Sequence, residues 1–229
     1  HICIVFCFLG LFYGLIFNNY SKKRSTVYLC LFYLLSFISG LSGIRYILYF
    51  EVPLAILYLW RQTNYYVQEK KEFNFKSFFL ENHKVKLSFL SLIISGIGYL
   101  FNSFILSKIY SYSNFNTVTF NTIGEIQPEK IYNDILSIFG YQNNVSVFTP
   151  AGIVNILVYI FLVFFIICFV KGLKTEKSEK IKDFLYFTLI MLIFNSFIIM
   201  KTEYIDRYFI LPFIFVIYRA LAFNGNSVF

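Results

Sequence analysis

The chain has 229 residues, of which 58% are hydrophobic, 22% aromatic and only 14% charged, and its net charge is +8. A soluble domain carries roughly 45–50% apolar and about 25% charged residues, so the composition excludes an ordinary soluble protein. It predicts an integral membrane protein that folds as an all-α, polytopic bundle of transmembrane helices.

Seven apolar segments are candidate membrane spans. They cover residues 2–17, 26–43, 46–60, 87–107, 152–170, 184–200 and 208–223. The third segment is short and contains Glu51 and Pro53, which predicts a kinked span. The chain starts at His1 and enters an apolar run at once, so we expect a fragment of a larger protein.

The basic residues predict the orientation in the membrane. With seven crossings, fifteen of the 20 Lys and Arg residues fall on one side, which the positive-inside rule assigns to the cytoplasm. The N-terminal edge then lies outside the plasma (inner) membrane and the C-terminus inside. Bases beside spans also contact anionic lipid headgroups, so we predict membrane lipids as partners and no nucleic acid.

Two loops are long enough to have structure of their own. The cytoplasmic loop, residues 61–86, mixes lysines with tyrosines and phenylalanines, which is typical of a segment that lies in the membrane interface. The outer loop, residues 108–151, has apolar residues at helical spacing after Pro128, which predicts a short amphipathic helix over residues 129–139.

Small and amide side chains within the spans predict helix contacts. The sequences SGLSG, residues 39–43, and SGIG, residues 95–98, would let two backbones approach closely. Asn102, Asn155 and Asn195 are candidates for hydrogen bonds between helices.

The four cysteines also lie in spans, where they behave as small apolar residues. They predict neither a disulfide framework nor a metal site, and they are Cys3, Cys7, Cys30 and Cys168.

The charged groups near the outer edge are the candidates for chemistry. Glu51 is the deepest, and its six-residue distance from Arg45 predicts a partner on another span. Two interpretations stay open: a structural ion pair that locks the helices together, or a role in handling a substrate or lipid carrier.

A short outer turn adds more charge. Glu203, Asp206 and Arg207 could line one outward-facing vestibule with Arg45 and Glu51. Arginine binds phosphate bidentately, and acids hold sugar hydroxyls or a divalent cation, although no cofactor is required. Interface anchoring and turn formation are the alternative.

Two stretches resemble GT-C class glycosyltransferases, membrane enzymes that use polyprenyl-phosphate sugars. They are IDRYFILPFIFVIY, residues 205–218, and SGLSGIRYILYFEVPLAIL, residues 39–57. The resemblance implies an outward-facing active site that transfers a sugar from a lipid carrier. It matches Arg207 to a contact for the lipid-linked phosphate and Tyr208 to its neighbour. The family's catalytic acid, in the first outer loop, has no counterpart here, so the catalytic residue stays unassigned.

Other functions remain open from the sequence. A polysaccharide polymerase or ligase also combines aromatic spans with a large outer loop, although residues 108–151 contain no arginine. A transporter would use an intramembrane acid such as Glu51, although no pair of matching broken segments is found. A scaffold or carrier-binding subunit is the non-catalytic alternative.

Overall fold

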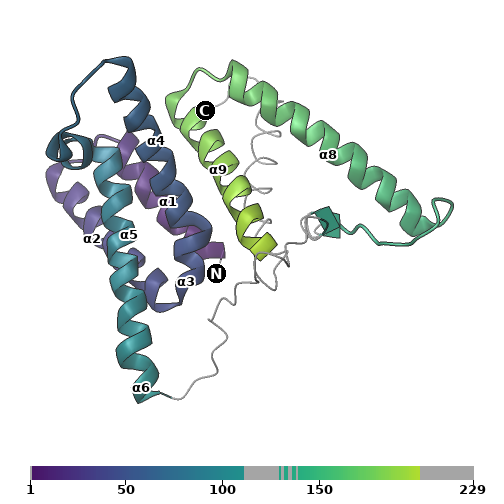
Figure 1. Ribbon diagram of the computed structural model, residues 1–229, viewed down its shortest axis with the longest axis horizontal. Coiled ribbons are helices and arrows are strands. Elements are labelled where there is room, and N and C mark those ends of the chain that lie inside the picture. Colours follow the sequence, from purple (N-terminus) through teal and green to yellow (C-terminus); the bar gives the residue numbers. More distant parts are fainter. Residues whose placement is uncertain (1, 111–128, 130–131, 134–135, 138, 202–229) are drawn as a thin grey trace. The chain divides into compact units, whose positions relative to one another are not determined.

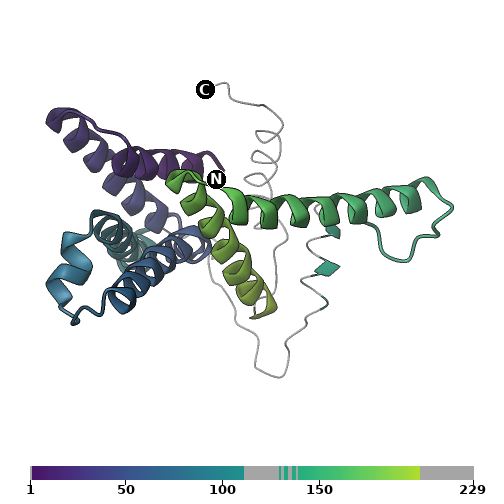
Figure 2. The ribbon, with the colours of Figure 1, turned by 90° about the horizontal axis from the view of Figure 1, so that it is seen from above.

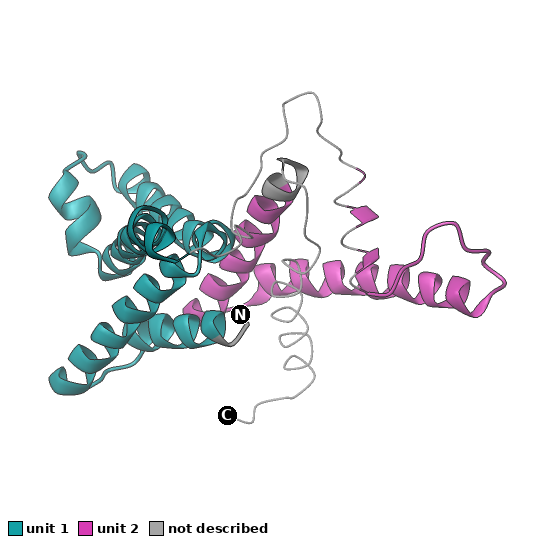
Figure 3. Ribbon diagram, turned by 90° about the horizontal axis from the view of Figure 1, so that it is seen from below, with its two compact units in different colours: residues 1–118 teal, residues 119–229 magenta. Residues whose placement is uncertain are grey.

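The computed structural model describes residues 2–110, 129, 132–133, 136–137 and 139–201 of the chain. The described residues form helices and connecting turns, with no β-strand among them, so the all-α prediction is confirmed. The chain divides into two compact units, His1–Val118 and Thr119–Phe229 (Figure 3).

The first unit is a bundle in which α5 packs against α2 and α4, and α1 packs against α2 (Figures 1 and 2). Two short elements connect α2 to α4, and two more extend α5 without a break. In chain order the elements are α1 (Ile2–Phe17), α2 (Lys22–Leu41), α3 (Ile44–Tyr46), η1 (Ile47–Glu51), α4 (Val52–Gln68), η2 (Ser77–Glu81), α5 (His83–Phe101), η3 (Asn102–Leu106) and α6 (Ser107–Ile109). The three η elements are π-helical turns.

Aromatic rings fill the core of this unit. Phe8 of α1 lies 4.7 Å from Phe32 of α2 and 4.9 Å from Phe50 of η1, measured between ring centroids. Phe12 lies 5.4 Å from Tyr58 of α4. These separations are typical of favourable aromatic pairs, and all five rings are buried. The aromatic content of the chain therefore has a packing role as well as an interfacial one.

Helices α2 and α5 approach so closely that glycine is required at two positions. A Cβ atom on Gly40 would lie 2.0 Å from the carbonyl oxygen of Ser95, and one on Gly98 would lie 2.4 Å from that of Phe37. The obstructing atoms belong to backbone and cannot rotate away. The close contact predicted from SGLSG and SGIG is therefore confirmed.

Within the described part of the chain, three helices are long and apolar enough to cross a membrane: Lys22–Leu41, His83–Ile109 and Pro150–Thr175. Ile4–Phe17 is apolar but shorter. The chain is thus a helical membrane protein, while the total of seven crossings stays a prediction. The expected span at 208–223 lies outside the described residues.

The third predicted span is irregular in the turn directly before Pro53. The π-helical turn η1 runs into α4 without a break, and a proline inside a helix removes one backbone hydrogen bond and crowds the carbonyl four residues earlier, here that of Tyr49 in η1. The helix then continues to Gln68, beyond the predicted end at residue 60.

The second unit contains a helical hairpin of α8 (Pro150–Thr175) and α9 (Glu179–Lys201). The two helices pack through Phe165, Phe169 and Leu185. The Thr149 hydroxyl accepts a hydrogen bond from the Gly152 N–H and so caps α8. Much of the amphipathic helix predicted at 129–139 lies outside the described residues.

Candidate functional site

Glu51 is the last residue of η1 and is fully buried in the first unit. A π-helical turn widens the helix by one residue and is frequent at functional sites. An acid in an apolar bundle needs hydrogen-bond partners, because a buried polar group without them destabilises the fold.

Hydroxyl groups from two other helices supply those partners. The Ser39 hydroxyl on α2 donates to one carboxyl oxygen of Glu51, at 2.5 Å, and the Ser95 hydroxyl on α5 contacts the other. Both hydroxyls also lie close to the Ser36 carbonyl oxygen, Ser39 at 2.7 Å and Ser95 at 2.8 Å. The prediction that Glu51 has a partner on another span is confirmed, but these partners are hydroxyl groups and not the opposite charge that a structural ion pair would need.

The serine on α5 belongs to a polar stripe that was not predicted from the sequence. Ser88, Ser91, Ser95, Gly98 and Asn102 are three or four residues apart and all are buried, so they share one helix face. That spacing is visible in the sequence, but it predicts only a small packing residue at Ser95. The second role of Ser95, as a donor to Glu51, depends on the register between α2, η1 and α5.

The asparagines had different outcomes. Asn102 donates to the Leu41 carbonyl oxygen at 2.6 Å, which confirms a hydrogen bond between helices. Asn155 instead exchanges two hydrogen bonds of 2.9 Å with the backbone of Gln142, in the loop before α8, so its predicted helix contact is wrong. The buried amide of Asn195 has no hydrogen-bond partner within the described part of the chain.

Arg45 lies at the turn that leads into Glu51. Gly43 ends the turn after α2 with a φ of 113°, a backbone conformation that favours glycine, and Arg45 follows on α3. The Arg45 side chain is half-buried. Arg45 and Glu51 therefore belong to one continuous helical segment, with the arginine at its start and the acid packed within the bundle.

The other predicted site residues, Glu203, Asp206, Arg207 and Tyr208, lie outside the described residues. The vestibule that would combine them with Arg45 and Glu51 stays a prediction. Within the described ranges, no three His, Cys, Asp or Glu side chains gather in a way that could hold a metal ion.

The geometry suits Glu51 to holding the helices rather than to meeting a substrate. Both of its oxygens contact hydroxyls, and its side chain has 0% exposure. It ties α2, η1 and α5 together and so fixes the turn that carries Arg45.

Comparisons of the chain with protein families, with curated proteins and with solved structures found no match.

Proposed function

We propose that the chain is part of a membrane enzyme of cell-envelope glycan assembly, which moves a sugar from a lipid-linked donor on the outer face of the plasma membrane. The observation that carries the proposal is the hairpin of residues 39–57. Arg45 lies at its turn, and Ser39 and Ser95 hold Glu51 within it. The same hairpin is one of the two stretches that resemble GT-C glycosyltransferases.

Arginine suits the recognition of a lipid-linked phosphate. Its planar guanidinium group can donate two parallel hydrogen bonds to phosphate oxygens, whereas lysine offers a point charge. We infer that Arg45 and Arg207 contact the phosphate of the donor. Glu51 then acts as a positioning residue for Arg45, and Asp206 and Glu203 are candidates for binding sugar hydroxyls or a divalent cation.

The charge distribution supports an outward orientation for Arg45. Lys22, Lys23 and Arg24 begin α2, whereas Arg45 follows its other end. Because basic residues are biased towards the cytoplasm, the end of α2 near Arg45 would face outside. A donor carried by a lipid in the outer leaflet would meet the turn there.

The test is sugar transfer from a radiolabelled polyprenyl-phosphate sugar in membranes that contain the whole protein of which the chain is a part. Arg45→Lys should raise the KM for the donor about tenfold, equivalent to about 1.4 kcal/mol, because bidentate contact is lost. Arg207→Lys should behave alike. Arg61→Lys is the matched control, since Arg61 is also half-buried but lies on α4 near the start of α5, and its KM should not change.

Glu51 is tested by rescue. Glu51→Gln keeps the volume and can still accept and donate hydrogen bonds, so a positioning role predicts nearly normal transfer, whereas Glu51→Ala should lose both stability and transfer. Absence of transfer by the unaltered whole protein, or an equal KM for Arg45→Lys and Arg61→Lys, would refute the proposal. Extension of a polymer without single-sugar transfer would favour the polymerase alternative instead.

A further inference from the structure

One end of the first unit combines two stretches that are distant in sequence. The Lys84 ammonium at the start of α5 lies 4.9 Å from the centroid of the Phe17 ring at the end of α1. The Asn82 amide donates to Gln62 of α4 at 2.5 Å. We call this end the basic end. It is formed by residues 17–24 and 60–86, and the second range includes the first turn of α5.

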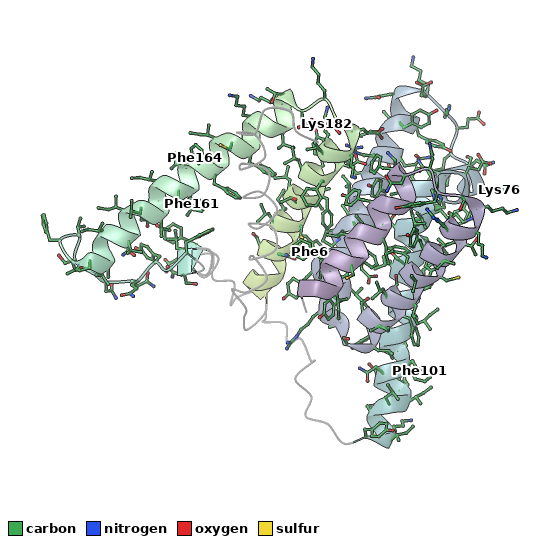
Figure 4. The ribbon with its side chains drawn as sticks, turned by 180° about the vertical axis from the view of Figure 1, so that it is seen from behind. Phe6, Lys76, Phe101, Phe161, Phe164 and Lys182 are labelled. Carbon is green, nitrogen blue, oxygen red and sulfur yellow. The ribbon has the colours of Figure 1, made fainter. Side chains whose placement is uncertain are left out.

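The basic end is strongly positive. It contains nine basic residues, Lys22, Lys23, Arg24, Arg61, Lys70, Lys71, Lys76, Lys84 and Lys86, against three acids, Glu69, Glu72 and Glu81. The opposite end of the same described bundle has Arg45 and Lys108. In Figure 4, Lys76 of the basic end and Phe101 of α5 lie towards opposite ends of the unit.

The segment between α4 and α5 is folded and leaves apolar rings uncovered. Buried Phe78 packs against Tyr66 at 5.2 Å and Phe73 at 5.3 Å, and the Tyr66 hydroxyl lies 2.6 Å from the Ser77 hydroxyl. Despite this packing, Phe73 is 68% exposed and Phe75 62% exposed. Exposed aromatic rings among lysines, next to a membrane span, match the boundary between headgroups and acyl chains.

We propose that the basic end binds anionic phospholipid headgroups, with its lysines against the phosphates and with Phe73 and Phe75 in the acyl boundary. Charge complementarity selects the headgroup, since a zwitterionic lipid would gain little from the net positive charge that nine bases and three acids leave at this end. The exposed rings add an apolar contact that basic residues serving orientation alone would not need. This inference does not depend on sugar transfer.

The protein contains its own reporter for this binding. Trp60 is the one tryptophan of the chain, and it is 44% exposed on α4, two residues before Gln62 at the level of the basic end. The full chain would be reconstituted in phosphatidylcholine bilayers that contain a small, equal fraction of brominated phosphatidylglycerol or brominated phosphatidylcholine. Brominated lipid quenches tryptophan fluorescence on contact. We expect the anionic quencher to be at least about twofold more effective, and this preference should fall as salt increases.

Variants of the protein test whether the preference for anionic lipid comes from the basic end. The triple substitution Lys23→Gln, Lys76→Gln and Lys86→Gln changes three exposed lysines, halves the net positive charge of the basic end and should clearly reduce the preference for the anionic quencher. Lys86→Gln and Lys108→Gln form a matched pair on one continuous helix, and only the first should reduce the preference. Equal quenching in the unaltered protein, or an unchanged preference in a triple variant with normal helical content, overturns the proposal.

Discussion

The contact between α2 and α5 can be tested by adding a single methyl group. Gly40→Ala would place a Cβ atom 2.0 Å from the Ser95 carbonyl oxygen, whereas ordinary contact begins at 3.4 Å. The helices would therefore have to separate by about 1.4 Å, because the obstructing atom is backbone. Even half of that separation, about 0.7 Å, would lengthen the contact between the Ser95 hydroxyl and the Ser36 carbonyl oxygen from 2.8 Å to about 3.5 Å, the limit of a hydrogen bond.

The expected cost has two parts. Overpacking of this kind costs typically about 1–3 kcal/mol. The separation also weakens the contacts of Glu51 with Ser39 and Ser95, and a hydrogen bond between membrane helices contributes roughly 0.6–2 kcal/mol. For a chain of this length, about 2–4 °C of melting temperature corresponds to each kcal/mol. We expect a decrease of several degrees.

The measurement is the apparent melting temperature of the detergent-solubilised protein, followed by circular dichroism at one heating rate. Gly96→Ala is the matched control, because Gly96 lies on α5 and a Cβ atom added there would have nothing within 4 Å. That variant should be unchanged or more stable, since alanine favours a helix over glycine by about 0.5–1 kcal/mol. If the Gly40→Ala and Gly96→Ala variants have the same melting temperature, the close approach of α2 and α5 is wrong.

Two further predictions concern the loop ends. Asn82→Ala should destabilise the protein by about 1–2 kcal/mol and by more than Thr149→Ala in the same melting assay, since both residues cap a helix but Asn82 also bonds Gln62; equal losses would contradict this. The Lys71 ammonium donates to the Tyr65 hydroxyl at 2.5 Å, and this hydrogen bond raises the pKa of Lys71 above its ordinary value. Tyr65→Phe should lower that pKa, leave more neutral amine in alkaline buffer, and speed acetylation of Lys71 relative to Lys76, as measured by mass spectrometry. An unchanged ratio of the two rates would count against the hydrogen bond.

The positions of the helices could be predicted from hydropathy, but their ends and irregularities could not. Apolar runs located α2, α5, α8 and α9 to within a few residues. The observed helices extend past several apolar boundaries, as at Lys22 and Thr175, because long basic side chains can reach the interface from a helical backbone. The π-helical turn at η1 leaves no mark on hydropathy, since it changes the backbone register without changing composition.

The candidate site could be predicted in part. The cost of a buried acid pointed to Glu51 and to a partner on another helix. It could not identify the partner, because a charged group and a pair of hydroxyls satisfy the same requirement. Only the packing register, set by Gly40 and Gly98, brings Ser39 and Ser95 to the two oxygens of Glu51.

The exposure pattern of α2 links packing to the membrane. Its buried positions include Ser36, Ser39 and Gly40, while the apolar residues on its opposite side are exposed: Val27 by 50%, Leu31 by 43%, Leu34 by 54% and Ile38 by 38%. A helix in water shows the reverse arrangement, with its apolar stripe inside. In lipid, small and polar residues favour helix contacts and apolar residues face the acyl chains. The polar groups that hold Glu51 are therefore also those that associate α2 with α5, so a substitution that disturbs Glu51 should also change how these two helices pack.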